Sequence, residues 1–207
     1  MNETPYYPAD ECVPIFDPQD GIIHDVVFRK KAHDEWLCHG HVNVWIPGEK
    51  RDTAIVQVKI KSHGKRDATI GGHIDCAPDA LPELRGRNIV ELAPRTAVKE
   101  WREESGMIFT EKDIIPLWNI TEFHDAPHPV SQAWNNGIVV AYVLNRRIAL
   151  AEILGNNTRE SGLSFEEVSI ETLLWLTQND RWQYLWKLIG EPYKGILHTL
   201  REQLRQI

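Results

Sequence analysis

Residues 99–107 read KEWREESGM and contain three glutamates, Glu100, Glu103 and Glu104, at positions i, i+3 and i+4. This spacing stacks the three side chains on one face of an α-helix. Carboxylates that close together raise one another's pKa and destabilise the helix unless a cation neutralises them. Because oxygen ligands suit a hard divalent ion, the stretch predicts one half of a site for Mg²⁺ or Mn²⁺.

The residues around the three glutamates predict an amphipathic helix with one buried face. Pro94 suits the first helical turn, and Gly106 suits the position after the last one. Ala93, Ala97 and Trp101 form an apolar stripe at fourfold spacing. A solvated charged face is the ordinary explanation of neighbouring glutamates, and the stripe is what favours a buried, functional helix instead.

The segment from Gly71 to Met107 resembles the Nudix box, G-x5-E-x7-R-E-U-x-E-E-x-G-U, in which U is aliphatic. Glu91 and residues 99–107 reproduce the second half in register, and Gly71-Gly72 supply the opening glycine. The box departs from the pattern by an insertion at residues 76–90, which suits a surface segment. It also has Lys99 in place of arginine and Trp101 in place of an aliphatic residue. Ordered motifs of this length are much more specific than dipeptides.

The resemblance implies an α/β/α sandwich with a mixed sheet, and a metal-dependent hydrolase that cleaves a diphosphate linkage in a nucleoside diphosphate joined to another moiety. The expected ligands of Mg²⁺ or Mn²⁺ are Glu100, Glu103, Glu104 and the Gly72 carbonyl. Water is then the nucleophile, and a carboxylate must take its proton. The expected base is Glu103 or Glu100.

Other residues are expected to assist this reaction. Glu166 or Glu167, predicted on a later loop, are alternative bases, while Glu91 and Lys99 are expected to hold the loop and the metal-binding glutamates in place. Lysine keeps the positive charge of arginine but not its two-pronged hydrogen bonding. Weaker candidates for contacts with the substrate are Lys59 and Lys61 on one strand face, together with Trp134 and Trp118 near the expected cleft.

Composition fits a single Nudix-type domain spanning residues 1–207. The chain is 42% hydrophobic, enough for a real core, and has a net charge of −7. That charge disfavours polymeric nucleic acid and favours a small anionic substrate handled by metal and local lysines. With no long apolar run and three scattered cysteines, we expect a soluble, cytoplasmic protein without disulfides or membrane contact. The apolar C-terminal helices could supply a homodimer surface.

Hydropathy patterns predict the order of the elements. Residues 1–30 are expected to form an N-terminal strand and hairpin. Alternation predicts strands at 41–47 and 54–61. In the second of these, Val56, Val58 and Ile60 share one face, and Gln57, Lys59 and Lys61 share the other. Further strands are expected at 113–125, 135–145 and 147–154, with a loop at 127–134 between the first two. From residue 164 to 207 the pattern predicts helices at 165–179, 180–190 and 193–207.

Histidines carry a second resemblance. His33, His41 and His73 are spaced in a way similar to the metal-binding histidines of isopentenyl diphosphate isomerase, a relative with the same fold. That enzyme needs a cysteine before the glycine pair and acidic residues in a later segment. This chain has no cysteine just before Gly71, and it has Asn135, Asn136 and Ile138 in the later segment. Isomerisation requires one residue to donate a proton and another to accept one, and this chain lacks both at these positions.

Two alternatives to the hydrolase therefore stay open. One is a Nudix-fold module that binds or regulates without turnover, which Lys99 and the insertion favour. The other is an isomerase-like enzyme that uses the histidines, for which no closed set of four metal ligands is evident from the spacing. Alternation alone would also place His39 and His41 on the same face of a strand.

Overall fold

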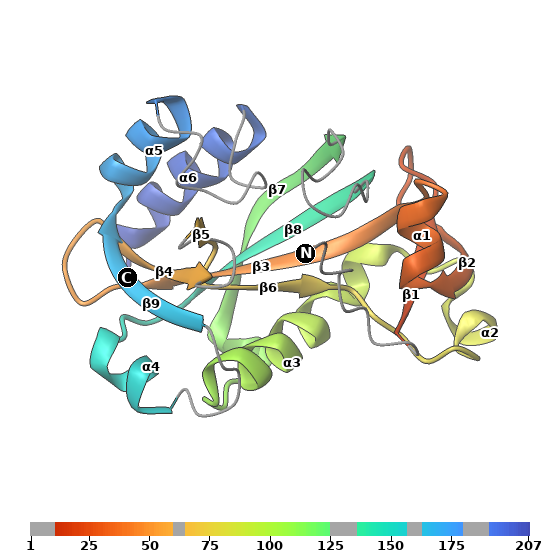
Figure 1. Cartoon of the computed structure of the whole chain (residues 1–207), viewed down its shortest axis with the longest axis horizontal. Coiled ribbons are helices and arrows are strands. Elements are labelled where there is room, and N and C mark those ends of the chain that lie inside the picture. Colours follow the sequence, from red (N-terminus) through yellow and green to blue (C-terminus); the bar gives the residue numbers. More distant parts are fainter. Residues whose placement is uncertain (1–10, 60–64, 125–135, 157–162, 180–190) are drawn as a thin grey trace, which may run out of the picture. The chain divides into compact units, whose positions relative to one another are not determined.

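A computed structural model describes residues 11–59, 65–124, 136–156, 163–179 and 191–207. Two compact units divide the chain, and each is described by itself. Unit 1 comprises residues 1–42, 73–96 and 120–140, and unit 2 comprises residues 43–72, 97–119 and 141–207. The elements follow one another along the chain as a mixture of strands and helices, labelled in Figure 1. This confirms the predicted α/β class.

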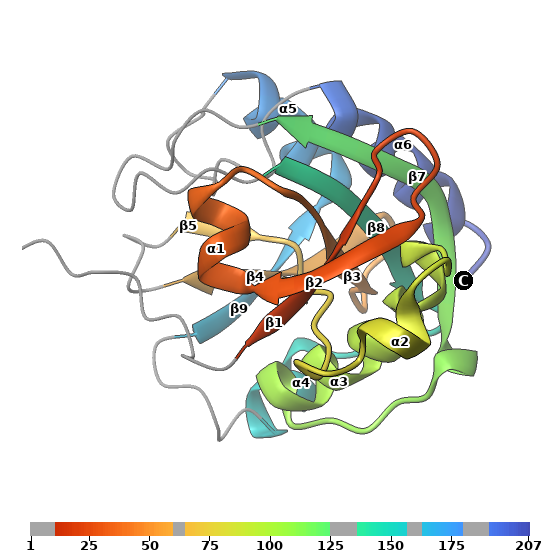
Figure 2. The same cartoon turned by 90° about the vertical axis from the view of Figure 1, so that its right-hand side faces the viewer.

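Unit 1 is built on an antiparallel hairpin of β1 (Cys12–Phe16) and β2 (Ile23–Phe28). β1 also pairs with β3 (Cys38–Pro47), where Ile15 lies opposite His39. Helix α1 (Arg29–Asp34) lies against the hairpin, as Figure 2 shows. Val13, Ile15 and Ala32 are buried in the core between them. The predicted N-terminal strand and hairpin are therefore confirmed.

The insertion at residues 76–90 is joined to this hairpin by backbone hydrogen bonds. It contains α2 (Leu81–Leu84) and leads into a 3₁₀ turn at Ile89–Glu91. The Ile23 N–H donates to the Arg87 carbonyl at 2.9 Å, and the Gly86 N–H donates to the Ile23 carbonyl at 2.9 Å. Isolated bridges add Ile22 opposite Asn88 and Cys12 opposite Cys76. The extra residues thus extend the pairing of the hairpin.

Strand β4 (Thr53–Lys59) is the centre of unit 2. It pairs with β3 at Ile46–Ile55, with β5 (Lys65–Asp67) at Gln57–Asp67, and with β9 (Leu163–Ser169) along its whole length. Ile55, Val56 and Gln57 are all buried, so both faces of the strand are covered there. The face predicted to carry Gln57 and the two lysines is therefore buried at Gln57. Three further strands each contain residues of both units. They are β6 (Ile70–His73), β7 (Ile114–His124) and β8 (Asn136–Leu144).

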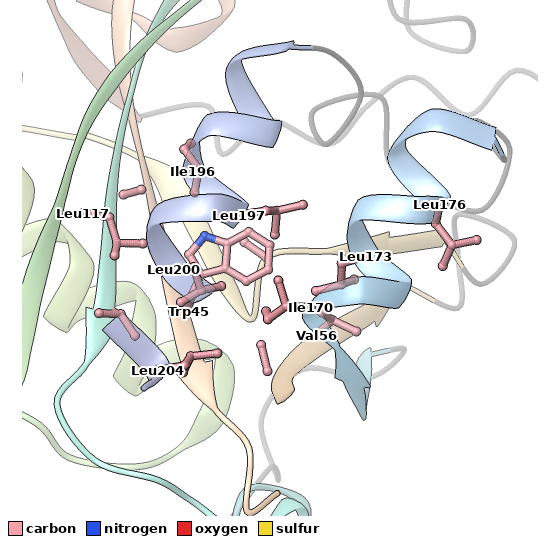
Figure 3. Close-up of a cluster of buried hydrophobic side chains, with 14 residues drawn as sticks. Trp45, Val56, Leu117, Ile170, Leu173, Leu176, Ile196, Leu197, Leu200 and Leu204 are labelled. Atoms are coloured by element: carbon pink, nitrogen blue, oxygen red, sulfur yellow. The ribbon is translucent and has the colours of Figure 1, made fainter. Parts of the chain in front are cut away.

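The core of unit 2 forms around the indole of Trp45, which has no exposed surface. Helices α5 (Ile170–Asn179) and α6 (Glu191–Leu204) cover it with leucine and isoleucine side chains. Figure 3 shows Trp45 beside Leu197 and Leu200 of α6, with Leu173 of α5 in the same cluster. Helices α5 and α6 confirm the predicted helices at 165–179 and 193–207 in part, and the predicted helix at 180–190 lies outside the described residues.

Two predicted elements were wrong. Residues 147–154, expected as a strand, fall mostly in helix α4 (Leu150–Asn156), which suits their alanine, leucine and glutamate content. Residues 164–169, expected to begin a helix, are strand β9, and α5 starts only at Ile170. Pairing with the full length of β4 outweighs the local helical pattern there. The single-domain boundaries stay a prediction.

None of the helices in the described ranges is both long and apolar enough to cross a membrane.

Candidate functional site

Helix α3 (Ala93–Ser105) carries the three glutamates of the box. Ala93, Ala97 and Trp101 are buried, which confirms the predicted apolar stripe. Pro94 lies in the first turn. Gly106 has φ +72° and its N–H donates to the Arg102 carbonyl, the left-handed end that glycine favours after a helix. The sequence therefore located both ends of this helix correctly.

Trp101 fixes α3 by its packing. Its ring meets that of Phe109 edge to face, with centroids 4.3 Å apart, so a neighbouring aromatic residue takes up the extra bulk at this position of the box. The Ser105 hydroxyl donates to the Trp101 carbonyl at 2.7 Å and accepts the Met107 N–H at 3.2 Å. With this face anchored, the face that carries the glutamates has a defined direction.

Glu104 is held by two donors from two strands of unit 2. Its Oε2 accepts the backbone N–H of Gly71 on β6 at 3.3 Å. The same oxygen accepts Nε2 of Gln57 on β4 at 3.1 Å. An ionised carboxylate only accepts hydrogen bonds, so two N–H donors suit its charged form. The opening glycines of the box are thus joined directly to its last glutamate.

Glu100 lies over the backbone of Gly72. A Cβ atom added at Gly72 would lie 2.5 Å from Glu100 Oε2 and 2.7 Å from Oε1, which is closer than real Cβ contacts. Only glycine leaves that space for the carboxylate. Nζ of Lys99 is 3.9 Å from Glu100 Oε1 in a partly exposed ion pair, and the supporting role of Lys99 stays a prediction.

These residues fit a hard divalent cation. Two carboxylates, those of Glu100 and Glu104, lie against the Gly71-Gly72 backbone, and Glu103, on the intervening turn of α3, is exposed. Oxygen donors of this kind are what Mg²⁺ and Mn²⁺ prefer. Within the described ranges, the ligand atoms of the three glutamates do not form a group closer than 4.8 Å to one another, so closing around an ion would require small side-chain rotations.

The other predicted acidic residues lie in different surroundings. Glu91 is half exposed in unit 1, where its Oε2 accepts Nε of Arg87 at 3.0 Å. Glu166 pairs with Arg66, with Nη2 to Oε2 at 3.1 Å, and Glu167 accepts the Lys50 N–H at 2.9 Å. Both lie on β9, so their predicted position on a loop was wrong. Each of these three glutamates therefore has a structural partner in the described part of the chain.

Four buried histidines form a second cluster, which lies in unit 1. His33 lies in the last turn of α1, His39 and His41 share one face of β3, and His73 ends β6. Among the described side chains, the ligand atoms of His33, His39 and His73 all lie within 4.8 Å of one another. The His41 ring centroid is 3.9 Å from that of His73.

The histidine prediction needs one correction. His39, rather than His41, completes the set with His33 and His73, because the His33 ring is 4.9 Å from His39 at the start of β3, whereas His41 lies two residues further along. Nδ1 of His39 lies 2.8 Å from the Leu37 carbonyl, which only accepts, so Nδ1 carries the proton and Nε2 is the nitrogen that could bind a metal. This is the tautomer that metal-binding histidines adopt.

Glycine also permits the close approach of β8 to this cluster. A Cβ atom at Gly137 would overlap the carbonyl oxygen of His39. Nδ2 of Asn136 donates to the Trp36 carbonyl at 3.1 Å, which ties the start of β8 to the loop before β3. Asn136 therefore lies close to the loop before β3, and Gly137 lies close to β3 itself.

The predicted substrate contacts are only partly described. Lys59 is the last residue of β4, opposite Lys65. Lys61 and Trp134 lie outside the described residues, and Trp118 lies within β7. Contacts between these residues and a substrate stay predictions.

Sequence reasoning missed Gln57 and His39. Gln57 was grouped with two lysines on one strand face, although a lone amide between Val56 and Val58 is a signal that it has a buried partner. His39 was recognised only as a neighbour of His41. The signal for it was the short Cys38-His39-Gly40-His41 run, whose alternation already predicted a shared face.

Comparison with solved structures gives the fold. The DR0079 protein of Deinococcus radiodurans matches 91% of this chain and 99% of its own, at 15% identity and a TM-score of 0.55. A NUDIX-family hydrolase of Clostridium perfringens matches 81% and 97%, at 17% identity and a TM-score of 0.42. The E. coli dihydroneopterin triphosphate pyrophosphohydrolase matches 77% and 92%, at 11% identity and a TM-score of 0.45.

No family model matches the sequence, and no curated protein does. Glycines of β6 lie against glutamates of helix α3, in the order of the box, within an α/β architecture that this chain shares with the DR0079 structure. The chain has the α/β fold of the DR0079 structure.

Proposed function

We propose that this protein is a metal-dependent hydrolase that cleaves a diphosphate linkage in a nucleoside diphosphate joined to another moiety. The observation that supports this most is the placement of two box carboxylates against the Gly71-Gly72 backbone. Glu104 accepts the Gly71 N–H, and Glu100 fills the space that Gly72 leaves open. A sequence motif could arise by chance, whereas this mutual fit of glycines and glutamates follows from the fold.

Each residue then has a defined task. Glu100, Glu103, Glu104 and the Gly72 carbonyl would hold Mg²⁺ or Mn²⁺, which would screen the phosphate oxygens and lower the pKa of the attacking water. Glu103 takes the proton of that water, because it is the exposed member of the set and can reach solvent. Lys99 balances the charge of Glu100.

The substrate side of the proposal rests on the sequence. Lys59 and Lys61 would pair with phosphate oxygens, and Trp134 would stack on the nucleoside. A net charge of −7 favours a small anionic substrate over polymeric nucleic acid. We further propose that the protein acts in the cytoplasm. We also propose that it forms a homodimer, and a measurement of its molecular mass in solution would test the homodimer.

The test is an assay of bond cleavage in nucleotide sugars, dinucleotides and nucleoside diphosphate derivatives, with Mg²⁺, with Mn²⁺ and with chelator. We expect cleavage of one substrate class that chelator abolishes and added Mg²⁺ restores. Cleavage that persists in chelator would contradict the role of the glutamates. Ligand binding without cleavage across the panel would instead support a silent binding module, the alternative that Lys99 favours.

The histidine cluster supports a second candidate function, which is binding of a borderline transition metal such as Zn²⁺ or Co²⁺. Three imidazoles with ligand atoms within 4.8 Å of one another, all buried, suit these ions better than Mg²⁺. His39 already has the required tautomer. The set shares His33 and His73 with the histidines that resemble those of the isomerase, although the acidic residues and the cysteine of that enzyme are missing.

Co²⁺ absorption measures this second function directly. We expect the wild type to give the visible bands of a tetrahedral or five-coordinate site, and His39→Ala to lose them. His24→Ala is the matched control, because His24 is exposed and lies outside the cluster. Equal spectra for wild type and His39→Ala would rule out this metal site.

A further inference from the structure

Gln57 is an amide in a buried position that apolar residues usually occupy. It lies in the middle of β4, opposite Asp67 on β5 and Phe165 on β9, and its exposed fraction is 1%. Burying an amide costs free energy unless it finds hydrogen-bonding partners. Its neighbours along the strand, Ile55 and Val56, are apolar and fully buried. A leucine would fill the same volume at lower cost, so an amide here requires a reason.

The partner of Gln57 is a carboxylate of the box helix. Nε2 of Gln57 donates to Glu104 Oε2 at 3.1 Å, and the Gly71 N–H donates to the same oxygen at 3.3 Å. Two donors from two strands fix the direction of the carboxylate more tightly than either one alone. Hydrogen bonds to a charged acceptor are also the strong ones. Gln57 is separated from Glu104 by 47 positions, and the Nudix box does not include it.

We propose that Gln57 is a positioning residue of the cation site, which holds the Glu104 carboxylate in the orientation that a divalent cation requires. The proposal rests on the function proposed above. Partners that hydrogen-bond a metal ligand orient it and set its basicity, and losing one such partner typically lowers metal affinity about 10-fold to 100-fold. The contribution of Gln57 passes entirely through Glu104.

A double-mutant cycle on the full chain tests this. Mn²⁺ affinity is measured from the electron paramagnetic resonance signal of free Mn²⁺ for wild type, Gln57→Leu, Glu104→Gln and the double variant. We expect Gln57→Leu to weaken binding about tenfold in the wild-type background. In the Glu104→Gln background the same change should alter affinity by less than about twofold, because the charged carboxylate that Gln57 orients is gone. A merely structural role would give similar losses in both backgrounds.

Two further variants serve as controls for misfolding and for the loss of any buried polar group of β4. Gln57→Asn keeps the amide but withdraws it by one methylene, so we expect a loss like that of Gln57→Leu even where leucine disturbs folding. Thr53→Val is the matched control, since Thr53 is another buried polar residue of β4 that bonds Lys50 and Glu167 instead. It should bind Mn²⁺ as the wild type does.

The outcomes separate the two proposals. Equal Mn²⁺ affinity in wild type and both Gln57 variants would overturn the role of Gln57. Wild-type binding that Glu104→Gln leaves unchanged would overturn the cation site and the role of Gln57 together. Coupling between Gln57 and Glu104 in a protein that cleaves no diphosphate would support the role of Gln57 and count against the proposed hydrolase alone.

Discussion

At the scale of single residues, the missing side chain at position 72 determines where the Glu100 carboxylate can lie. Gly72→Ala would place a methyl group in the space of the two carboxylate oxygens. The end of a glutamate side chain can swing away, so we expect a small loss of stability, below about 1 kcal/mol, and a loss of activity of at least about tenfold. Urea unfolding and the hydrolysis assay measure the two effects. A loss of stability with full activity would contradict this account.

Cys76 supplies a second prediction at this scale. Burial raises the pKa of its thiol to about 12, with Cys12 and Asp75 adding to the shift. Because the thiolate is the nucleophile, iodoacetamide at about pH 8 should modify Cys76 at least about a hundredfold more slowly than a free cysteine. Mass spectrometry of the alkylated peptides gives the rates. Denaturant serves as the control and should restore rapid modification, whereas rapid modification of the folded chain would show that the thiol is accessible as thiolate.

At the scale of elements, α3 depends on the contact between Trp101 and Phe109. Trp101 has an exposed fraction of 1%, and its ring centroid is 4.3 Å from that of Phe109. Trp101→Ala should lower the free energy of unfolding by about 3–5 kcal/mol, the usual cost of emptying a buried aromatic site. Trp101→Leu, which restores the aliphatic residue of the box, should cost less. Equal stability of wild type and Trp101→Ala would contradict the observed packing.

The turn between β3 and β4 responds to pH through Glu167. Burial alone would raise the pKa of Glu167, but hydrogen bonds from Thr53 and from the Lys50 backbone lower it below its ordinary value. A lowered pKa in the folded state contributes stability above the unfolded pKa, and that stability is lost as pH falls through the folded pKa.

Thr53→Val tests this link. Removing the hydroxyl should cost about 1 kcal/mol at neutral pH, and the difference from wild type should shrink below about pH 4 as Glu167 becomes protonated. Urea unfolding of both proteins at several pH values measures it. A difference that stays constant down to about pH 3 would show that Glu167 does not carry the effect.

Elements with strong patterns were predicted well from the sequence, and those that depend on long-range pairing were not. Helix α3 has a clear apolar stripe, a proline in its first turn and a glycine after its end, so local chemistry fixes it. Strand β9 has no such signals. It is a strand because Thr53–Lys59 of β4 pairs with all of it, a contact more than 100 residues away in sequence. Periodicity within a short window cannot contain that information.

At the scale of the whole molecule, the box glutamates were predictable because a motif lists their order, while the hydrogen-bonding partner of Glu104 outside the motif was not. Gly71 and Gly72 belong to the motif, and Gln57 does not. The histidine cluster was predictable only in part, since it combines a helix end, a strand and a second strand end. Which of two histidines on one strand face completes such a set depends on packing in three dimensions.

Binding of a cation to the folded chain should raise its overall stability. If Mg²⁺ binds only the folded state, a concentration of about 100 times its Kd adds about 2.7 kcal/mol to the free energy of unfolding. Chemical unfolding with and without Mg²⁺ measures this gain for wild type. Glu104→Gln should lose most of it, whereas Glu111→Gln, at an exposed glutamate outside α3, should keep it. No difference between the two variants would contradict a cation site on α3.

The most direct test of the central claim is the rate of Mg²⁺-dependent diphosphate cleavage by Glu103→Gln compared with wild type. The substitution keeps size and removes one charge from an exposed position, so the melting temperature should not change. We predict that kcat/KM falls at least about a hundredfold, because both a metal ligand and the base are lost. Unchanged turnover in a folded Glu103→Gln protein would contradict the assignment of the box glutamates to the reaction.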